Sequence, residues 1–162
     1  MICLPNCKND KIVNNGQTSV NGEIFRVIIN VKVLEDDKFQ LFYVDDSSEG
    51  KYNINKRTVT YVNGKNEFQS VEFKLPANVL PRKFRIDVGE NNYETAIDIK
   101  EIEIKFNNNL IKINDKVLER FFQPNQYLKK LKNNYMRIKI DGRYDPFIDS
   151  TPLLIKKIEL EL

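Results

Sequence analysis

The spacing of apolar residues along this chain predicts β-strands over most of its length. Residues 23–34 carry apolar side chains at odd positions, and the same period of two returns at 68–75 and 84–88. Residues 39–44 are apolar on both faces, which is typical of a central strand. Further strands, giving eight or nine in all, are expected at residues 57–62, 110–113, 135–140 and 153–162.

One strand must bend if its apolar side chains are to stay in the core. The apolar residues up to Ile99 lie at odd positions, whereas those from Ile102 to Phe106 lie at even positions. A change of phase by one residue turns side chains to the opposite face. We therefore expect a β-bulge near Lys100 and Glu101. This strand is expected to form the central pair of the fold with the strand at 84–88.

One short passage is expected to be helical. Apolar residues from Val117 to Phe122 follow Asp115, a candidate N-cap, at helical spacing, and a second helical turn is expected at 127–131. In the strand expected at 135–140, Met136, Ile138 and Ile140 are expected to face inward. The predicted fold class is all-β, an antiparallel β-sandwich of the jelly-roll type with a short helical insert at residues 115–132.

Length and composition agree with one domain and exclude several kinds of site. The 162 residues suit a single domain at 21–162, preceded by a loose, Asn-rich segment at 1–20. Histidine is absent, which removes His-based triads and His-ligated metals. Cys3 and Cys7 have no second pair for a zinc site, and a local disulfide and two free thiols both stay open.

Charge and hydropathy indicate which partners and which compartments to expect. The net charge is only +3, with basic and acidic residues interspersed, so no nucleic-acid partner is expected. No apolar run approaches the ~18 residues of a membrane span, so we expect no direct membrane insertion by this chain. The first residues are too short an apolar run for a signal peptide. Either the protein is cytoplasmic, or the chain is a mature or excised piece of something longer.

The acidic loop at 45–50 is the candidate metal site. Asp45 and Gly50 match the first and sixth positions of an EF-hand loop, but Lys56 occupies the place of the bidentate glutamate. An EF-hand is therefore rejected. A general calcium site at Asp45 and Asp46 is kept as an alternative to the favoured interpretation, a solvated acidic loop. No other cofactor is expected.

The candidate ligand-binding residues combine charge with aromatic rings. Arg85 and Asp87 project from the same face of one strand, where they either grip sugar hydroxyls or satisfy each other, and the second, structural interpretation is favoured. Five tyrosines offer rings on which a sugar could stack, at positions Tyr43, Tyr52, Tyr61, Tyr93 and Tyr144, although most are expected to be sheet or rim residues. Of these, Tyr43, Tyr93 and Tyr144 are kept as candidate ligand-binding residues. Catalysis is not expected, because the carboxylates mostly alternate outward on strands, where they are solvated.

Several short motifs, in their order, resemble galactose-binding-like jelly-roll domains that accompany bacterial membrane-linked glycan and glycosyltransferase proteins. The motifs lie at residues 39–43 with the acidic loop after them, 71–76, 84–89, 97–104 and 145–148. Val88 departs from the family pattern, which has proline there. The resemblance implies a non-catalytic accessory module that binds glycans of the cell envelope, outside the cytoplasm or at a membrane as part of a larger protein. The alternative is a structural or protein-interaction β-sandwich.

Overall fold

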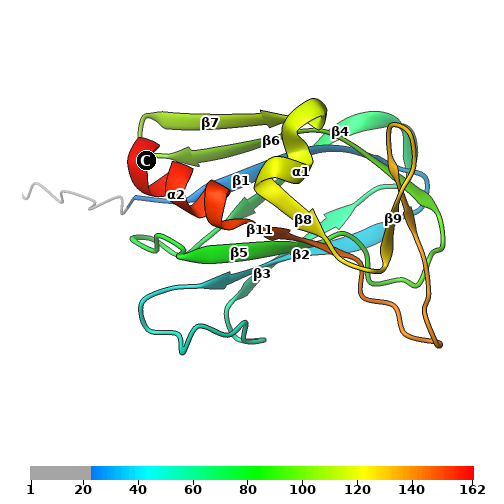
Figure 1. The fold of residues 1–162 in the computed structure, drawn as a ribbon, viewed down its shortest axis with the longest axis horizontal. Coiled ribbons are helices and arrows are strands. Elements are labelled where there is room, and N and C mark those ends of the chain that lie inside the picture. The colour runs from blue at the N-terminus through cyan, green and yellow to red at the C-terminus, as the bar shows by residue number, and fades with distance from the viewer. Residues whose placement is uncertain (1–22) are drawn as a thin grey trace, which may run out of the picture.

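The computed structural model describes residues 23–162, which form two antiparallel β-sheets stacked face to face (Figure 1). The predicted antiparallel β-sandwich is confirmed. The predictions for the loose segment at 1–20 and for Cys3 and Cys7 concern positions outside the described residues.

Each sheet is assembled from strands that are distant in sequence. In spatial order, the six-stranded sheet contains β4 (Lys65–Lys74), β1 (Arg26–Val33), β6 (Ala96–Phe106), β10 (Tyr135–Arg137) and β9 (Leu128–Lys130), with β7 (Asn109–Asn114) also paired to β6. The five-stranded sheet contains β3 (Arg57–Val62), β2 (Asp37–Val44), β5 (Lys83–Asp87), β11 (Phe147–Ser150) and β8 (Phe122–Pro124).

The core lies between the sheets and follows from the alternation of apolar residues. On β1 the side chains at odd positions, from Val27 to Val33, are fully buried, while those between them are partly exposed. Phe25 packs against Phe84 of the opposite sheet with ring centroids 6.0 Å apart in an edge-to-face arrangement. Burial of such side chains from both sheets supplies the main driving force for the sandwich.

The bulge expected in β6 is present at the expected place. Asn30 of β1 pairs with Glu101, but its neighbour Val31 pairs with Ile99, so Lys100 is the extra residue. Ile99 and Ile102 are consequently both buried despite their different parity. The bulge lets one strand keep its apolar side chains inward along its whole length.

The expected pairing of β5 with β6 is wrong. β5 lies between β2 and β11 in one sheet, whereas β6 lies beside β1 in the other. The residues between the two strands cross from sheet to sheet instead of closing a hairpin. Gly89 and Asn92, with φ angles of 148° and 59°, provide the backbone conformations of this crossing.

The helical insert is shorter than expected. Within residues 115–132, the helical residues form only a 3₁₀ turn, η1 (Asp115–Val117), and the short helix α1 (Leu118–Phe121). Asn114 rather than Asp115 is the N-cap residue, and its side chain accepts a hydrogen bond from the amide of Lys116. The second helical turn expected at 127–131 is wrong, because Phe122 resumes an extended conformation and the chain continues as β8 and β9.

The strand expected at 153–162 is also wrong, since this segment forms a helix, α2 (Pro152–Glu161). Thr151 caps the helix by accepting a hydrogen bond from the amide of Leu154, and Pro152 occupies the first turn. Leu154 and Ile158, four residues apart, enter the core from one face of the helix. The apolar positions in this segment therefore have a helical period.

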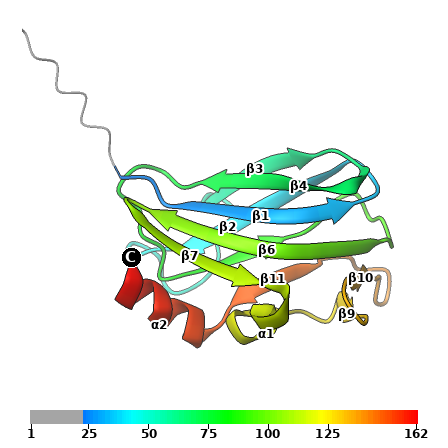
Figure 2. The same ribbon diagram turned by 90° about the horizontal axis from the view of Figure 1, so that it is seen from above.

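The two helices close one open edge of the sandwich. They contact each other, and α2 also contacts β7 of one sheet and β11 of the other (Figure 2). The helices thus seal the gap between the sheets and lie over neither outer face. Within residues 23–162, no helix has the length and apolar character needed to cross a membrane.

Candidate functional site

The structure places the seven residues selected from the sequence in four different locations. Arg85 and Asp87 lie on the outer face of the five-stranded sheet, and Tyr93 and Tyr144 lie at one end of the sandwich. Of the remaining three, Tyr43 lies in the core, and Asp45 and Asp46 lie in the loop after β2. The outer face around Arg85 is the candidate site.

This outer face is organised in rows by the pairing of the strands. Because side chains alternate along a strand, residues that pair across the sheet point to the same side. One row reads Arg57, Phe42, Arg85, Asp149 and Gln123, the next reads Val59, Gln40, Asp87 and Phe147, and the last contains Tyr61 and Lys38. We call these outward residues the polar face.

Arg85 is held by aromatic rings at the centre of the polar face. Its guanidinium carbon lies 4.2 Å from the ring centroid of Phe147, 4.9 Å from that of Phe42 and 5.6 Å from that of Tyr52. Its Nη2 atom donates a 2.9 Å hydrogen bond to Asp87 Oδ2. The arginine therefore combines cation–π contacts with a charge-assisted hydrogen bond.

Asp87 is the buried member of this pair, with 7% of its surface exposed. Two neighbouring polar atoms, Asp87 Oδ1 and Arg85 Nε, are buried and have no hydrogen-bond partner among residues 23–162. Burial raises the pKa of Asp87 to about 7, with Arg85 opposing the shift and Asp145 adding to it. Each member of the pair thus has one buried polar atom without a hydrogen-bond partner.

Tyr52, in the loop between β2 and β3, contacts Arg85 of this pair with its ring. Its hydroxyl donates a 2.5 Å hydrogen bond to Asp149 Oδ1, and its ring centroid lies 4.9 Å from Lys83 Nζ. Burial and the hydrogen bond to Asp149 raise the pKa of Tyr52 far above its usual value, so the hydroxyl remains a donor. Tyr52 bounds the polar face at this end.

A chain of polar contacts continues toward the other end. Gln40 Oε1 accepts a 2.5 Å hydrogen bond from Arg57 Nη1, and Gln40 Nε2 donates to Glu90. Glu90 in turn forms an ion pair with Lys38, which lies opposite Tyr61 on β3. The ring of Tyr61 is 82% exposed. Beside it is a cavity of about 230 Å³ whose lining includes Asp36, Asn63 and Asn91.

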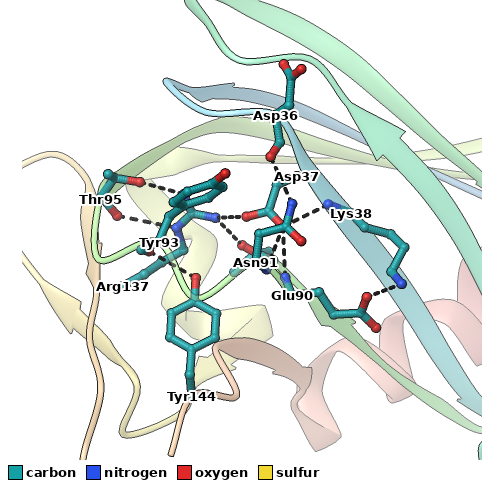
Figure 3. A network of polar contacts seen from close by, with 10 residues as sticks. Asp36, Asp37, Lys38, Glu90, Asn91, Tyr93, Thr95, Arg137 and Tyr144 are labelled. Carbon is teal, nitrogen blue, oxygen red and sulfur yellow. Dashed lines mark hydrogen bonds and ion pairs between the residues drawn. The ribbon is translucent and has the colours of Figure 1, made fainter. Parts of the chain in front are cut away.

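At this end of the sandwich, a buried ion pair connects the two sheets (Figure 3). Arg137 of β10 donates from Nη1 to Asp37 Oδ2 of β2 over 2.7 Å and to the carbonyl of Val88 over 3.0 Å. Its Nη2 atom donates to Thr95 Oγ1 over 2.7 Å. The expectation that Met136 faces inward is therefore wrong, because Arg137 is the fully buried residue and Met136 is only partly buried.

Tyr93 and Tyr144 belong to this network and not to the Arg85 pair. The hydroxyl of Tyr144 donates a 3.1 Å hydrogen bond to the carbonyl of Tyr93, as Figure 3 shows. Burial raises the pKa of Tyr144 to about 12. Both tyrosines therefore pack around Arg137, where they support the segment that crosses between the sheets.

Tyr43 lies in the hydrophobic core with 6% of its surface exposed, so its ring offers no surface to a ligand. Asp45 and Asp46 point to different partners. Asp45 Oδ1 accepts a 2.5 Å hydrogen bond from Lys56, which lowers its pKa far below the usual value, and Asp46 pairs with Arg82. Within residues 23–162 no group of three or more Asp, Glu, Cys or His side chains is arranged to hold a metal ion.

Sequence reasoning missed several residues of the site. Phe42 was not selected, because its strand is apolar on both faces. An aromatic residue on the outer side of such a strand nevertheless indicates a contact on that side. Tyr52 was named as a possible stacking ring, but its contact with Arg85 was not expected, because the sequence does not indicate the position of its loop. Asp37 and Arg137 meet only in the folded chain, 100 residues apart.

The fold and this site define an antiparallel β-sandwich with a polar, aromatic outer face. Comparisons of the chain with protein-family models, with curated proteins and with solved structures found no match. The sandwich implied by the resemblance to galactose-binding-like domains is present, and no family is identified.

Proposed function

We propose that this domain is a non-catalytic carbohydrate-binding module whose ligand lies on the polar face around Arg85 and Asp87. The observation that carries the proposal is the unfilled pair formed by Asp87 Oδ1 and Arg85 Nε. Buried polar atoms are nearly always hydrogen-bonded, because an unmade bond costs about 1–3 kcal/mol. A sugar hydroxyl both donates and accepts, so sugar hydroxyls could satisfy an unfilled acceptor and an unfilled donor.

The surroundings of the pair also suit a saccharide. Aromatic rings and charged groups alternate on the polar face, and charge-assisted hydrogen bonds are the stronger kind. Because both unfilled atoms are buried, a ligand must displace a covering side chain to reach them. Tyr52 is the ring that a loop rather than a strand carries, so we assign the movement to Tyr52.

Hydrolysis of the bound sugar is not part of the proposal. The raised pKa of Asp87 resembles that of a general acid, but glycoside hydrolysis needs a second carboxyl group across a cleft. Asp149 accepts the hydrogen bond of Tyr52, and Asp145 lies 3.7 Å from Arg85 Nη2. Both neighbouring carboxylates are therefore engaged, which favours binding over catalysis.

The proposed setting is a cell-envelope glycan system, with the domain outside the cytoplasm or beside a membrane as part of a larger protein. This setting rests on the resemblance of the sequence motifs alone. Neither a nucleic-acid partner nor insertion of this chain into a membrane is proposed. Several basic residues of the six-stranded sheet are paired with acidic ones, as in the contacts of Lys112 with Glu101 and Glu103.

A structural or protein-interaction domain is the second candidate. Leu110 of β7 and Leu153 and Leu160 of α2 are exposed large apolar side chains, of the type that a protein partner covers. Arg85 and Asp87 would then serve only to satisfy each other. This candidate needs no saccharide, so the same binding experiment separates the two.

The test is a glycan array followed by calorimetric titration of the positive saccharides, using envelope-type sugars that contain galactose or N-acetylglucosamine. We expect binding by the wild type and about tenfold weaker binding by Asp87→Asn, which replaces one carboxyl oxygen by an amide nitrogen at little change in shape. Asp98→Asn, which removes a carboxylate from the opposite sheet, is the matched control and should bind as the wild type does. Absence of binding to every saccharide would contradict the proposal.

A further inference from the structure

Tyr61 is an exposed aromatic ring that the site around Arg85 does not use. It is 82% exposed, compared with 40% for Phe68 and 38% for Tyr93. A single exposed ring is ordinary on a protein surface. Tyr61 is a candidate binding residue because a cavity lies beside it.

The cavity beside Tyr61 combines the ring with polar side chains. Its volume is about 230 Å³, and Asp36, Lys38, Asn63 and Asn91 contribute to its lining. Asp36 Oδ1 accepts a hydrogen bond from the amide of Gly64, and its carboxylate is directed away from the ion-pair network (Figure 3). Carboxylate and amide groups around an aromatic ring supply the donors, acceptors and apolar surface that a sugar ring needs.

The cavity is built on a rigid support. Asp37 Oδ1 accepts hydrogen bonds from the amides of Glu90 and Asn91 at 2.9 and 3.1 Å, and its other oxygen is held by Arg137. The segment that carries Asn91 is therefore fixed to β2 before any ligand arrives. A pre-organised site loses less conformational entropy on binding.

The Tyr61 cavity and the Arg85 pair lie on the same side of the five-stranded sheet. Lys38 and Phe42 face outward from the same strand, four residues apart, which corresponds to about 13 Å along β2. Between them, Gln40 connects to Glu90 on one side and to Arg57 on the other. A monosaccharide is too short to contact both ends, whereas a chain of several sugar units could.

We propose that the ligand is an extended oligosaccharide and that Tyr61 and its cavity form a second sugar subsite on the polar face. This inference rests on the proposed function and specifies its ligand class. One end of the chain contacts Arg85 and Asp87, and another unit stacks on Tyr61 and reaches Asp36 and Asn91. The two subsites act together because their sugars belong to one molecule.

The experiment is a calorimetric series with galactose and N-acetylglucosamine oligosaccharides of increasing length, from the monosaccharide upward. For the wild type we expect affinity to increase with chain length. Tyr61→Ala should weaken oligosaccharide binding about tenfold, equal to about 1.4 kcal/mol, and leave monosaccharide binding unchanged. Tyr61→Phe keeps the ring and should bind nearly as the wild type does. Phe68→Ala, which removes an exposed ring from the other sheet, is the matched control.

The outcomes separate the two proposals. Saccharide binding that is independent of chain length, or that Tyr61→Ala leaves unchanged, overturns the second subsite and leaves the carbohydrate-binding function standing. Failure of every saccharide in the series to bind overturns the function and the second subsite together. Length-dependent binding that is weakened in Tyr61→Ala and retained in Phe68→Ala supports both.

Discussion

Arg137 and Asp37 form an ion pair in which both side chains are completely shielded from solvent, with Nη1 and Oδ2 2.7 Å apart. The pair joins β10 of one sheet to β2 of the other. Its remaining polar atoms are also satisfied, since Arg137 donates to Thr95 and Asp37 accepts from three backbone amides. The pair therefore fixes how the segment between β5 and β6 crosses the sandwich.

Removing one partner of this pair should be costly. Arg137→Met leaves the carboxylate of Asp37 buried without its countercharge, and loss of such a partner costs about 3–5 kcal/mol. We expect a decrease of that size in the free energy of unfolding measured with urea. Arg143→Met removes an exposed arginine and should change the free energy by less than about 0.5 kcal/mol. Equal stability of the two variants would contradict the structural role of the pair.

Gly89 makes the close approach of the crossing segment to the ion pair feasible. A Cβ atom at this position would lie 2.5 Å from Arg137 Nη1 and 2.8 Å from Asp37 Oδ2, at a φ of 148°. Gly89→Ala should therefore destabilise the protein by about 3 kcal/mol or more. At Gly142, whose φ is 76°, a Cβ would meet nothing within 4 Å, so Gly142→Ala should cost only about 1 kcal/mol. Thermal melts of both variants compare the two costs. Similar melting temperatures would contradict the requirement for glycine at position 89.

Asp87 should make stability depend on pH. Burial raises its pKa to about 7 in the folded protein from an ordinary 3.8, so the folded state binds the proton more tightly. The stabilisation from the neutral carboxyl is complete below about pH 4 and is lost as the pH rises through about 7. Asp87→Asn does not titrate and should gain stability relative to the wild type over this range, by up to about 4 kcal/mol. Urea unfolding at several pH values measures the difference in the free energy of unfolding between Asp87→Asn and the wild type. A difference that does not change with pH would contradict the prediction.

Thr151 should contribute to the stability of α2. Its hydroxyl accepts from the amide of Leu154 and donates to the carbonyls of Arg120 and Phe121. Thr151→Ala removes the N-cap and should cost about 1 kcal/mol, whereas Thr151→Ser keeps the hydroxyl and should be nearly neutral. Circular dichroism melts distinguish the two variants. An alanine variant as stable as the serine variant would show that the cap is dispensable.

Local patterns predicted the parts of the fold that depend on neighbouring residues. The alternation in β1 and the change of phase around Lys100 in β6 each follow from which face a side chain occupies, so strand and bulge were predictable. The last segment was mistaken for a strand because its apolar residues are dense enough to match either period. Thr151 followed by Pro152 is typical of a helix N-terminus, and this feature indicates a helix, α2, rather than a strand.

The site was less predictable, because its residues meet through long-range contacts. Arg85 and Asp87 lie two positions apart on one strand, so their shared face could be inferred. The rings that contact Arg85 come from other elements, including Phe147 and Tyr52, whose positions no local pattern specifies. The same holds for Arg137, which a parity rule alone placed on the wrong side of β10.

The measurement that tests the central claim most directly is nuclear magnetic resonance of isotope-labelled protein during titration with a saccharide that binds in the array. The account predicts that the largest chemical-shift changes occur on the polar face, including the side-chain Nε–H of Arg85 and the side-chain amide of Gln40. Signals from the outer face of the six-stranded sheet, such as the amides around Lys112, should stay in place. Shifts confined to that opposite sheet, or an Arg85 Nε–H signal that does not respond at saturation, would contradict it.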